Sequence, residues 1–315
     1  MTLYALARPR LEAWLAAAAA LAAGVICSVS YLLPPPSTSD FDQFWTGARA
    51  LLQGMDAYAV VPTMGTHYPL YYPLPAVLIS LPLAILPVFL ARVIWAAVGA
   101  SVFVLAALRY RRGLLPALLS ACFLNAVVQG QWSPLLTAAA VLPALSWVWA
   151  AKPSIGLALF VGYPDRRAVV GGLLLVCLAF LVHPSWLTGW LEALRESNYI
   201  APIMRPGGVL LLLALVRWRM PEARLLAGLA CVPQTIGLYE ALPLFLIPRS
   251  RWQGYWMAGL SYLAAFGQLL LPRQDGLIWE ATNAARWPLF FCFLYVPALV
   301  ILLFFSQRAS EDQRL

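Results

Sequence analysis

Charged side chains are scarce in this chain of 315 residues: Asp, Glu, Lys and Arg together make up only 11% of it. Soluble globular domains carry about 25% charged residues, so the shortage excludes an ordinary soluble protein. Lys152 is the only lysine, and His67 and His183 are the two histidines. The 21 basic residues are scattered along the chain, unlike the dense basic stripe of a nucleic-acid-binding protein. We therefore expect no nucleic-acid partner.

Several chemical signatures are missing as well. The chain has no Walker A loop, no Rossmann glycine pattern and no HExxH, which argues against nucleotide-driven and metalloprotease chemistry. The sequence indicates no metal site and no cofactor, and leaves a divalent ion open. Each cysteine lies in an apolar run without a CxxC partner, so we interpret all five as packing residues: Cys27, Cys122, Cys177, Cys231 and Cys292.

Apolar residues dominate instead, at 62% of the chain, with a mean hydropathy of +0.78. This composition predicts an all-α polytopic membrane protein with about 8–10 transmembrane helices in a single domain, 1–315. Residues 13–33 are uncharged and long enough to cross a bilayer, which makes 1–33 the first span. An external loop with interfacial helices (34–87), a helix bundle (88–306) and a cytoplasmic tail (307–315) follow.

The arginines predict the topology. Basic clusters favour the cytoplasmic side, which places the N-terminus in the cytoplasm and the first loop outside a cytoplasmic (inner) membrane. The clusters are Arg8/Arg10, Arg109/Arg111/Arg112, Arg166/Arg167, Arg217/Arg219/Arg224, Arg249/Arg251 and Arg308. Residues 73–87 are too short and too rich in proline to cross, so they fit an interfacial or re-entrant helix. The second span is then 89–108, with Arg92 snorkelling at its outer end.

Residues 113–151 are uncharged and predict two spans joined by an external hinge at Gly130-Gln131. By this parity Lys152 lies toward the cytoplasm. Residues 153–164 are too short to cross, 168–182 lead out to His183, and a segment ending at residue 216 returns. Residues 225–248, which contain Glu240, fit either one kinked span or a hairpin of two half-helices. Keeping Arg249 inside favours the hairpin.

The first external loop contains the most unusual local sequence. From Phe41 to Leu52, apolar residues recur at helical spacing, which predicts an amphipathic interfacial helix that stops at Gly54. Ser39 and Asp42 fit a capping box at its start. We expect Asp40 to be held ionised by the helix N-terminus, where its carboxylate can accept a proton from a sugar hydroxyl.

Five motifs in this order resemble glycosyltransferase family 87: Asp40-Phe41-x-x-Phe44-Trp45; Ala48-Arg49-x-Leu51-Leu52-x-Gly54-x-x-x-Tyr58; Tyr72-Pro73-Leu74-Pro75; Gly130-Gln131-x-Ser133-x-Leu135-Leu136; and Lys152-Pro153. The resemblance covers residues 40–157. It implies a GT-C-type bundle and a mannosyltransferase-like activity. It also implies a polyprenyl-phosphate sugar as donor, with a glycolipid, glycan or protein as acceptor, and a site at the external face among membrane lipids.

The resemblance further implies an inverting transfer in which an acid of the first external loop is the catalytic base. Asp40 matches that position, with Asp42 as the fallback. The leaving phosphate then needs a cation or hydrogen-bond donor. The candidates are Arg49, His67, Gln131, Arg205 and Arg286, and the resemblance adds Tyr72 and Lys152.

Two further polar residues have open interpretations. Glu240 either lines an acceptor cavity or is buried and hydrogen-bonded to Gln234 or Thr235. His183 is either a donor in the cavity or a satisfied interfacial histidine. Two other functions stay open for the chain as a whole: a transporter or flippase of lipid-linked sugars, and a non-catalytic GT-C-like subunit.

Overall fold

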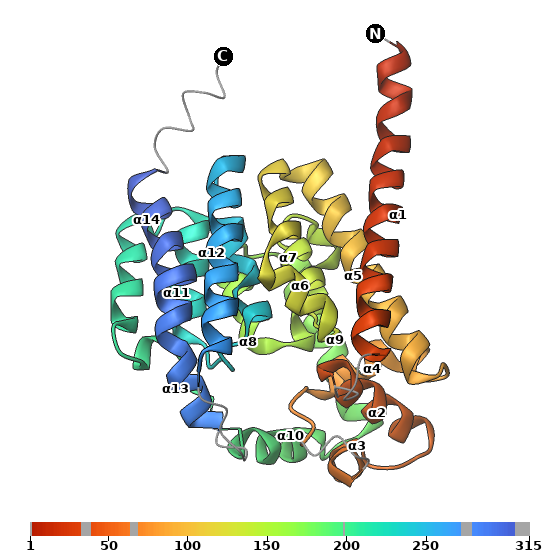
Figure 1. Ribbon diagram of the computed structural model, residues 1–315. Coiled ribbons are helices and arrows are strands. Elements are labelled where there is room, and N and C mark those ends of the chain that lie inside the picture. Colours follow the sequence, from red (N-terminus) through yellow and green to blue (C-terminus); the bar gives the residue numbers. More distant parts are fainter. Residues whose placement is uncertain (1, 33–38, 64–68, 198, 272–278, 306–315) are drawn as a thin grey trace. The chain divides into compact units, whose positions relative to one another are not determined.

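The computed structural model describes residues 2–32, 39–63, 69–197, 199–271 and 279–305. Within these ranges the chain is helical, with one isolated β-bridge between Ile200 and Gln234 and no β-strand (Figure 1). The prediction of an all-α protein is therefore confirmed. His67 lies outside the described residues.

The described chain divides into two compact units, each assembled from three separate stretches. Unit 1 comprises Met1–Tyr110, Ala126–Lys152 and Arg167–Glu196, and unit 2 comprises Arg111–Asn125, Pro153–Arg166 and Ser197–Leu315. The first part of the chain forms α1 (Thr2–Leu32), α2 (Asp40–Leu52), α3 (Ala57–Val60), η1 (Val61–Thr63), α4 (Leu74–Ser80), η2 (Leu81–Leu83) and α5 (Val88–Tyr110). The middle forms η3 (Arg112–Leu119), α6 (Ala121–Val128), α7 (Ser133–Ala139), η4 (Pro143–Ala151), α8 (Pro153–Gly162), α9 (Arg166–Val182) and α10 (Trp186–Arg195). The last part forms η5 (Pro202–Met204), η6 (Gly208–Arg217), α11 (Pro221–Cys231), η7 (Leu238–Leu246), α12 (Arg251–Leu269), α13 (Trp279–Phe290), η8 (Phe291–Tyr295) and α14 (Val296–Phe304).

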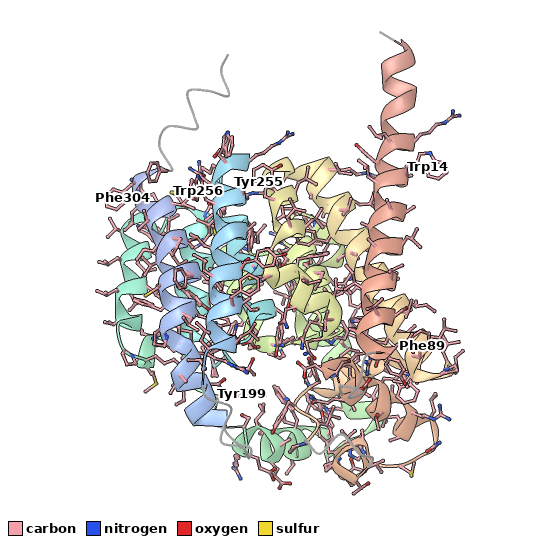
Figure 2. The ribbon with its side chains drawn as sticks, viewed as in Figure 1. Trp14, Phe89, Tyr199, Tyr255, Trp256 and Phe304 are labelled. Atoms are coloured by element: carbon pink, nitrogen blue, oxygen red, sulfur yellow. The ribbon has the colours of Figure 1, made fainter. Side chains whose placement is uncertain are left out.

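Three helical stretches are long and apolar enough to cross a membrane: Arg10–Leu32, Val88–Arg109 and Asn283–Phe304. A fourth span is added if α9 and α10, bent by 103° at residues 183–185, are taken together. Large apolar side chains on these helices are open to the surroundings. Trp14 on α1 is 74% exposed (Figure 2). Leu181 on α9 is 81% exposed. Contact of such large apolar side chains with water is unfavourable. Their exposure therefore indicates that these helices belong to a membrane protein. The predicted total of spans stays a prediction.

Helices α1 and α5 pack side by side in unit 1 and run in opposite directions (Figure 1). Arg109 at the end of α5 pairs with Glu12 near the start of α1, with 3.0 Å between Nε and Oε2. At the opposite end of the pair, Trp45 of α2 donates to the carbonyl of Leu83, just before α5 begins. The basic N-terminal end and the Asp40 end thus lie at opposite ends of this pair, as the charge pattern predicts.

Several segments are short 3₁₀ helices where the hydropathy predicted α-helical spans. A 3₁₀ helix rises about 2.0 Å per residue against 1.5 Å for an α-helix. The ten residues of η6 therefore extend about 20 Å, which an α-helix of that length would not reach. Proline occurs inside η3 and η7, where it removes a backbone donor and disfavours a regular α-helix.

Residues 225–248 form two half-helices rather than one kinked span. Helix α11 ends at Cys231, and η7 begins at Leu238 after a turn in which Ile236 adopts a left-handed conformation with a φ of +52°. Of the two interpretations left open by the sequence, the hairpin is the one observed.

Candidate active site

Four polar side chains from separate segments meet in unit 1. The Nε2 group of Gln131 donates to Oδ2 of Asp40. The Oε1 atom of Gln131 accepts from Lys152 Nζ at 3.1 Å and from the Tyr72 hydroxyl at 3.2 Å. The Lys152 ammonium also lies 5.6 Å from the centre of the Tyr72 ring. A single buried glutamine therefore joins the candidate base, the only lysine and a tyrosine.

The start of α2 and the loop at Gly130 bring Asp40 and Gln131 together. Asp40 is the first residue of α2, and the amide of Phe41 donates to the carbonyl of Gln129 at 3.3 Å. Gly130 has a φ of +58°, and a Cβ atom at this position would come within 2.6 Å of the Phe41 Cβ. Only glycine fits this approach, because it accepts a positive φ and has no side chain. The next residue then reaches Asp40.

Tyr72 is fixed by the extended segment that contains it. Pro73 disfavours the α-helical conformation for the residue before it, so Tyr72 ends the segment as α4 begins. The backbone of Tyr71 donates to Gln43 at 3.2 Å and accepts from Trp190 at 3.0 Å. The Tyr58 hydroxyl donates to the Tyr72 carbonyl at 3.1 Å. These contacts from α2, α3 and α10 hold the tyrosine in place.

An aromatic cluster supports the polar group. Phe44 packs against Tyr72, Trp95 and Trp132 with ring centres 5.1, 5.6 and 5.4 Å apart. All four side chains are buried, and Trp95 donates to the Gly130 carbonyl at 3.0 Å. Since the face of α2 that carries Phe44 is buried here, its predicted amphipathic face packs on protein rather than on lipid.

The position of Lys152 corrects the predicted topology. Helix α7 has only seven residues and rises about 10 Å, far short of the roughly 30 Å of a bilayer core. The chain then reverses into η4, where Trp149 donates to the carbonyl of Leu136 on α7 at 3.0 Å. The second of the two spans predicted in 113–151 is therefore not a single crossing helix, because the chain turns back on itself after α7. Lys152 returns to the end of the unit where Gln131 lies, and the prediction of opposite sides is wrong.

No protein-family model, curated protein or solved structure matches this chain. The resemblance to glycosyltransferase family 87 therefore stays a prediction.

Asp42, the fallback base, is engaged structurally. Its side chain accepts from the Ser39 amide at 3.1 Å, which is the predicted capping interaction. Both its oxygens also bind the guanidinium of Arg92, at 2.6 and 2.5 Å. Arg92 is only 2% exposed and lies over the ring of Tyr31. The prediction that Arg92 snorkels is wrong, because an ion-pair partner inside the unit replaces the headgroup region.

Two other predicted site residues in unit 1 lie elsewhere. Arg49 is exposed in the last turn of α2, 5.4 Å from the Trp45 ring centre. His183 lies at the bend between α9 and α10, where its Nε2 is 3.3 Å from Ser185 Oγ and 3.4 Å from Asp56 Oδ1. These contacts match the interpretation of His183 as an interfacial histidine whose ring has polar partners.

The remaining predicted residues belong to unit 2. Glu240 is buried and accepts from the amide and hydroxyl of Thr235, both at 2.8 Å, so it closes the turn before η7. This is the buried alternative stated for it. Arg205 is 7% exposed and lines a mostly apolar cavity of about 250 Å³ with Trp287 and Phe291. Arg286 is half-buried on α13 and is not among the residues lining that cavity.

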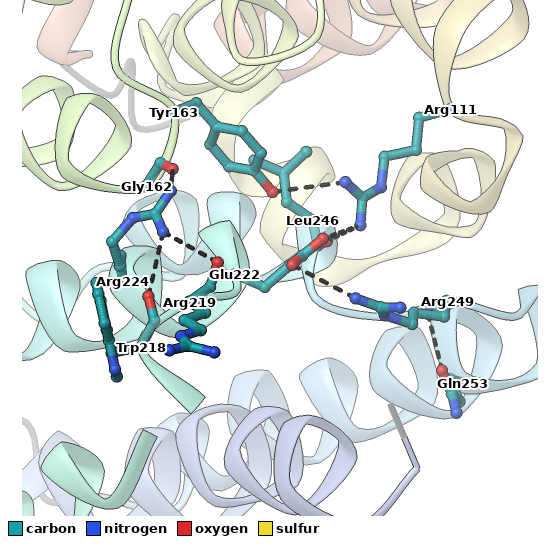
Figure 3. Close-up of polar contacts among 10 residues, drawn as sticks. All are labelled: Arg111, Gly162, Tyr163, Trp218, Arg219, Glu222, Arg224, Leu246, Arg249 and Gln253. Carbon is teal, nitrogen blue, oxygen red and sulfur yellow. Dashed lines mark hydrogen bonds and ion pairs between the residues drawn. The ribbon is translucent and has the colours of Figure 1, made fainter. Parts of the chain in front are cut away.

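An ionic cluster around the buried Glu222 in unit 2 escaped the sequence interpretation (Figure 3). Arg111 donates to Glu222 at 2.9 Å and to the Leu246 carbonyl at 2.5 Å, and Arg249 lies 3.7 Å from the same carboxylate. Arg111 Nη1 also donates to the Tyr163 hydroxyl at 3.5 Å. Burial raises the pKa of Tyr163 to about 12, with Arg111 acting in the opposite direction. Burial alone would lower the pKa of Arg111, but Tyr163 and Glu222 raise it above its ordinary value.

In the sequence, the feature that pointed to this cluster was a single acidic residue, Glu222, between the basic groups Arg217/Arg219 and Arg224. Its partners come from basic clusters far away in the sequence. Arg224 likewise donates to the Gly162 carbonyl at the end of α8, at 3.0 Å, and Arg217 donates to the Leu303 carbonyl near the end of α14, at 2.6 Å. Arginines of these clusters thus cap helix C-termini within unit 2, a role suited to their forked donors.

Proposed function

We propose that this protein is a GT-C-type membrane glycosyltransferase. It transfers a mannose-like sugar from a polyprenyl phosphate to an acceptor hydroxyl, with Asp40 as the general base. The observation that carries the proposal is the cluster of Asp40, Tyr72, Gln131 and Lys152. Four of the five motifs behind the family resemblance each contribute one polar group to it. Motif residues that served only packing would have no reason to converge on one hydrogen-bonded site.

The chemistry requires one proton transfer and one displacement. Asp40 accepts the proton of the acceptor hydroxyl, and the acceptor oxygen attacks the anomeric carbon of the sugar. The bond between that carbon and the lipid phosphate oxygen breaks, and the phosphate leaves with the electron pair. Because the attack and the departure are in line, the anomeric configuration inverts. The positive charge of Lys152, close to the base, suits the charge that develops on the phosphate.

Asp40 fits the role of base better than Asp42. Both oxygens of Asp42 are bound by Arg92, and the side chain also holds the Ser39 amide. A carboxylate engaged in this way is a poor proton acceptor, because protonation would break an ion pair with a buried arginine. Asp40 is half-buried at the start of α2, where the helix dipole favours the ionised form.

In this proposal the cluster faces the external side of a cytoplasmic membrane, and the acceptor is a glycolipid, a glycan or a protein. The lipid chain of the donor stays in the bilayer while its phosphate reaches the end of unit 1. Such a placement requires no nucleotide, since the energy of the transfer comes from the sugar–phosphate bond.

The test uses the purified full-length protein in liposomes, with radiolabelled mannose linked to polyprenyl phosphate and a heat-treated envelope extract as acceptor. We expect wild-type protein to move label from the donor lipid to the acceptor fraction. Asp40→Asn should lower the rate at least ~100-fold, because a base contributes about that much. Glu192→Gln, which neutralises an exposed acid on α10, is the matched control and should keep the rate. Donor binding without consumption by wild-type protein would instead indicate a non-catalytic lipid-sugar-binding protein.

A further inference from the structure

The orientation of the Gln131 amide is fixed by the charges on either side of it. Its NH₂ group meets the Asp40 carboxylate, and its carbonyl oxygen meets the Lys152 ammonium. A flipped amide would place oxygen against the carboxylate and N–H groups against the ammonium, and both contacts would be repulsive. In this orientation the Tyr72 hydroxyl donates to the same carbonyl.

Gln131 is also held rigidly. Its side chain is 3% exposed, and its backbone amide donates to the Ala126 carbonyl at 2.8 Å. It directly follows Gly130, whose close contact with Phe41 sets the distance between the loop and α2. The amide therefore cannot follow the carboxylate if Asp40 moves, so it determines where the Asp40 oxygen lies.

Among the described residues, other ionisable groups lie on the elements near Gln131. Asp42 in the first turn of α2 and Arg92 on α5 form an ion pair with each other. The hydroxyl of Tyr58, on α3, donates to the Tyr72 carbonyl. Burial raises the pKa of Tyr58, and the nearby charge of Asp56 raises it further, so this side chain stays neutral. Asp40 and Lys152 are thus the two charges that the Gln131 amide itself contacts.

We propose that Gln131 is a positioning residue that couples the charge of Lys152 to Asp40 and orients the Asp40 carboxylate toward the acceptor hydroxyl. The role in orienting a base rests on the proposed function, whereas the coupling of the two charges does not. The sequence had suggested a different role for Gln131, as a neutral donor to the leaving phosphate. The observed bonds direct its NH₂ group to the carboxylate instead.

The coupling can be measured without any transfer assay, because Lys152 is the only lysine in the chain. An amine-reactive reagent labels only this side chain and the N-terminal amine, and peptide mass spectrometry separates the two. The measurement is the pH at which Lys152 labelling is half-maximal in purified protein. Gln131→Met removes an acceptor of the Lys152 ammonium, and Asp40→Asn removes the negative charge of the carboxylate. Each should lower the half-labelling pH by about one unit, a tenfold change in the protonation equilibrium.

Gln234→Met is the matched control. It removes a similarly buried glutamine amide from unit 2, one whose carbonyl oxygen accepts from the Tyr295 hydroxyl at 2.7 Å. Its half-labelling pH should stay at the wild-type value. Gln131→Glu keeps the shape of the side chain, adds a negative charge beside Lys152, and should raise the half-labelling pH by at least one unit. This variant carries the test if Gln131→Met does not fold. An unchanged value in the Gln131 variants would overturn the coupling.

The positioning role is tested by the pH profile of sugar transfer. Gln131→Met should lower the rate about tenfold and move the acid limb of the profile to higher pH, because the carboxylate loses a donor. A purely structural role would lower the rate at every pH alike. Wild-type transfer by Gln131→Met would overturn the positioning role. Labelling shifts as expected, together with no transfer by wild-type protein, would leave the coupling intact and refute the proposed function alone.

Discussion

Asp42 binds the guanidinium of Arg92 with both of its carboxylate oxygens, although the two residues lie 50 positions apart in the sequence. The bond ties the first turn of α2 to α5, one of the candidate membrane spans. The same turn begins with Asp40. The ion pair therefore sets the position of the candidate base relative to the membrane-spanning part of unit 1.

The first prediction concerns the stability that this pair provides. Asp42→Asn leaves the Arg92 charge buried without its carboxylate, and removing one partner of a buried pair costs about 3–5 kcal/mol. We expect a clearly lower unfolding temperature in detergent, measured by thermal scanning with a thiol- or tryptophan-based readout. Arg49→Met, which removes an exposed arginine from the same helix, should change stability by less than about 0.5 kcal/mol. Equal stability of the two variants would refute the structural role of Asp42.

The second prediction compares two glycines with positive φ. Gly130→Ala forces a side chain into a left-handed conformation and brings its Cβ within 2.6 Å of Phe41, so we expect a loss of about 3 kcal/mol. Gly54→Ala has a φ of +71° but no atom within 4 Å of the new Cβ, so only the backbone cost of about 1 kcal/mol applies. Chemical denaturation in mixed detergent micelles measures both. A Gly54 variant as unstable as the Gly130 variant would contradict the close approach of the loop to α2.

The third prediction separates the structural role of arginine from its charge. Arg111→Lys keeps the positive charge that favours the cytoplasmic side but cannot span Glu222 and the Leu246 carbonyl with a fork of donors. We expect unchanged membrane insertion and a loss of about 1–2 kcal/mol in stability. Arg251→Lys alters an exposed arginine of the same type and should cost almost nothing. Insertion is measured by alkaline extraction of membranes, and stability by thermal unfolding.

The fourth prediction concerns alkaline pH. The pKa of Tyr163 is about 12 in the folded protein and close to 10 in an unfolded chain, because burial disfavours the phenolate. The contribution of the neutral side chain to stability is therefore complete below pH 10 and is lost as the pH rises from 10 toward 12. Wild-type protein should lose unfolding temperature in this window more steeply than Tyr163→Phe, which has no proton to lose. Parallel curves for the two proteins would contradict the burial of this hydroxyl.

The sequence by itself determined the class of protein and the local elements. Scarce charge and long apolar runs predicted an all-α membrane protein, and the apolar spacing after Asp40 predicted the amphipathic α2. The Ser39–Asp42 cap was also readable, because it depends on residues a few positions apart, and residues 153–164 were correctly expected to be too short for a span. Interactions of this range follow directly from the order of the residues.

The tertiary structure alone decided which distant side chains meet. Hydropathy counts apolar residues but does not reveal that the chain reverses after α7, and this reversal brings Lys152 back to Gln131. It also does not reveal that Arg92 finds Asp42, or that Arg111 finds Glu222. The local sequence around a charged residue in an apolar run is the same whether its side chain extends to the membrane surface or forms an ion pair inside the protein. Only the packing of separate helices determines which of these two arrangements gives the charged side chain the lower free energy.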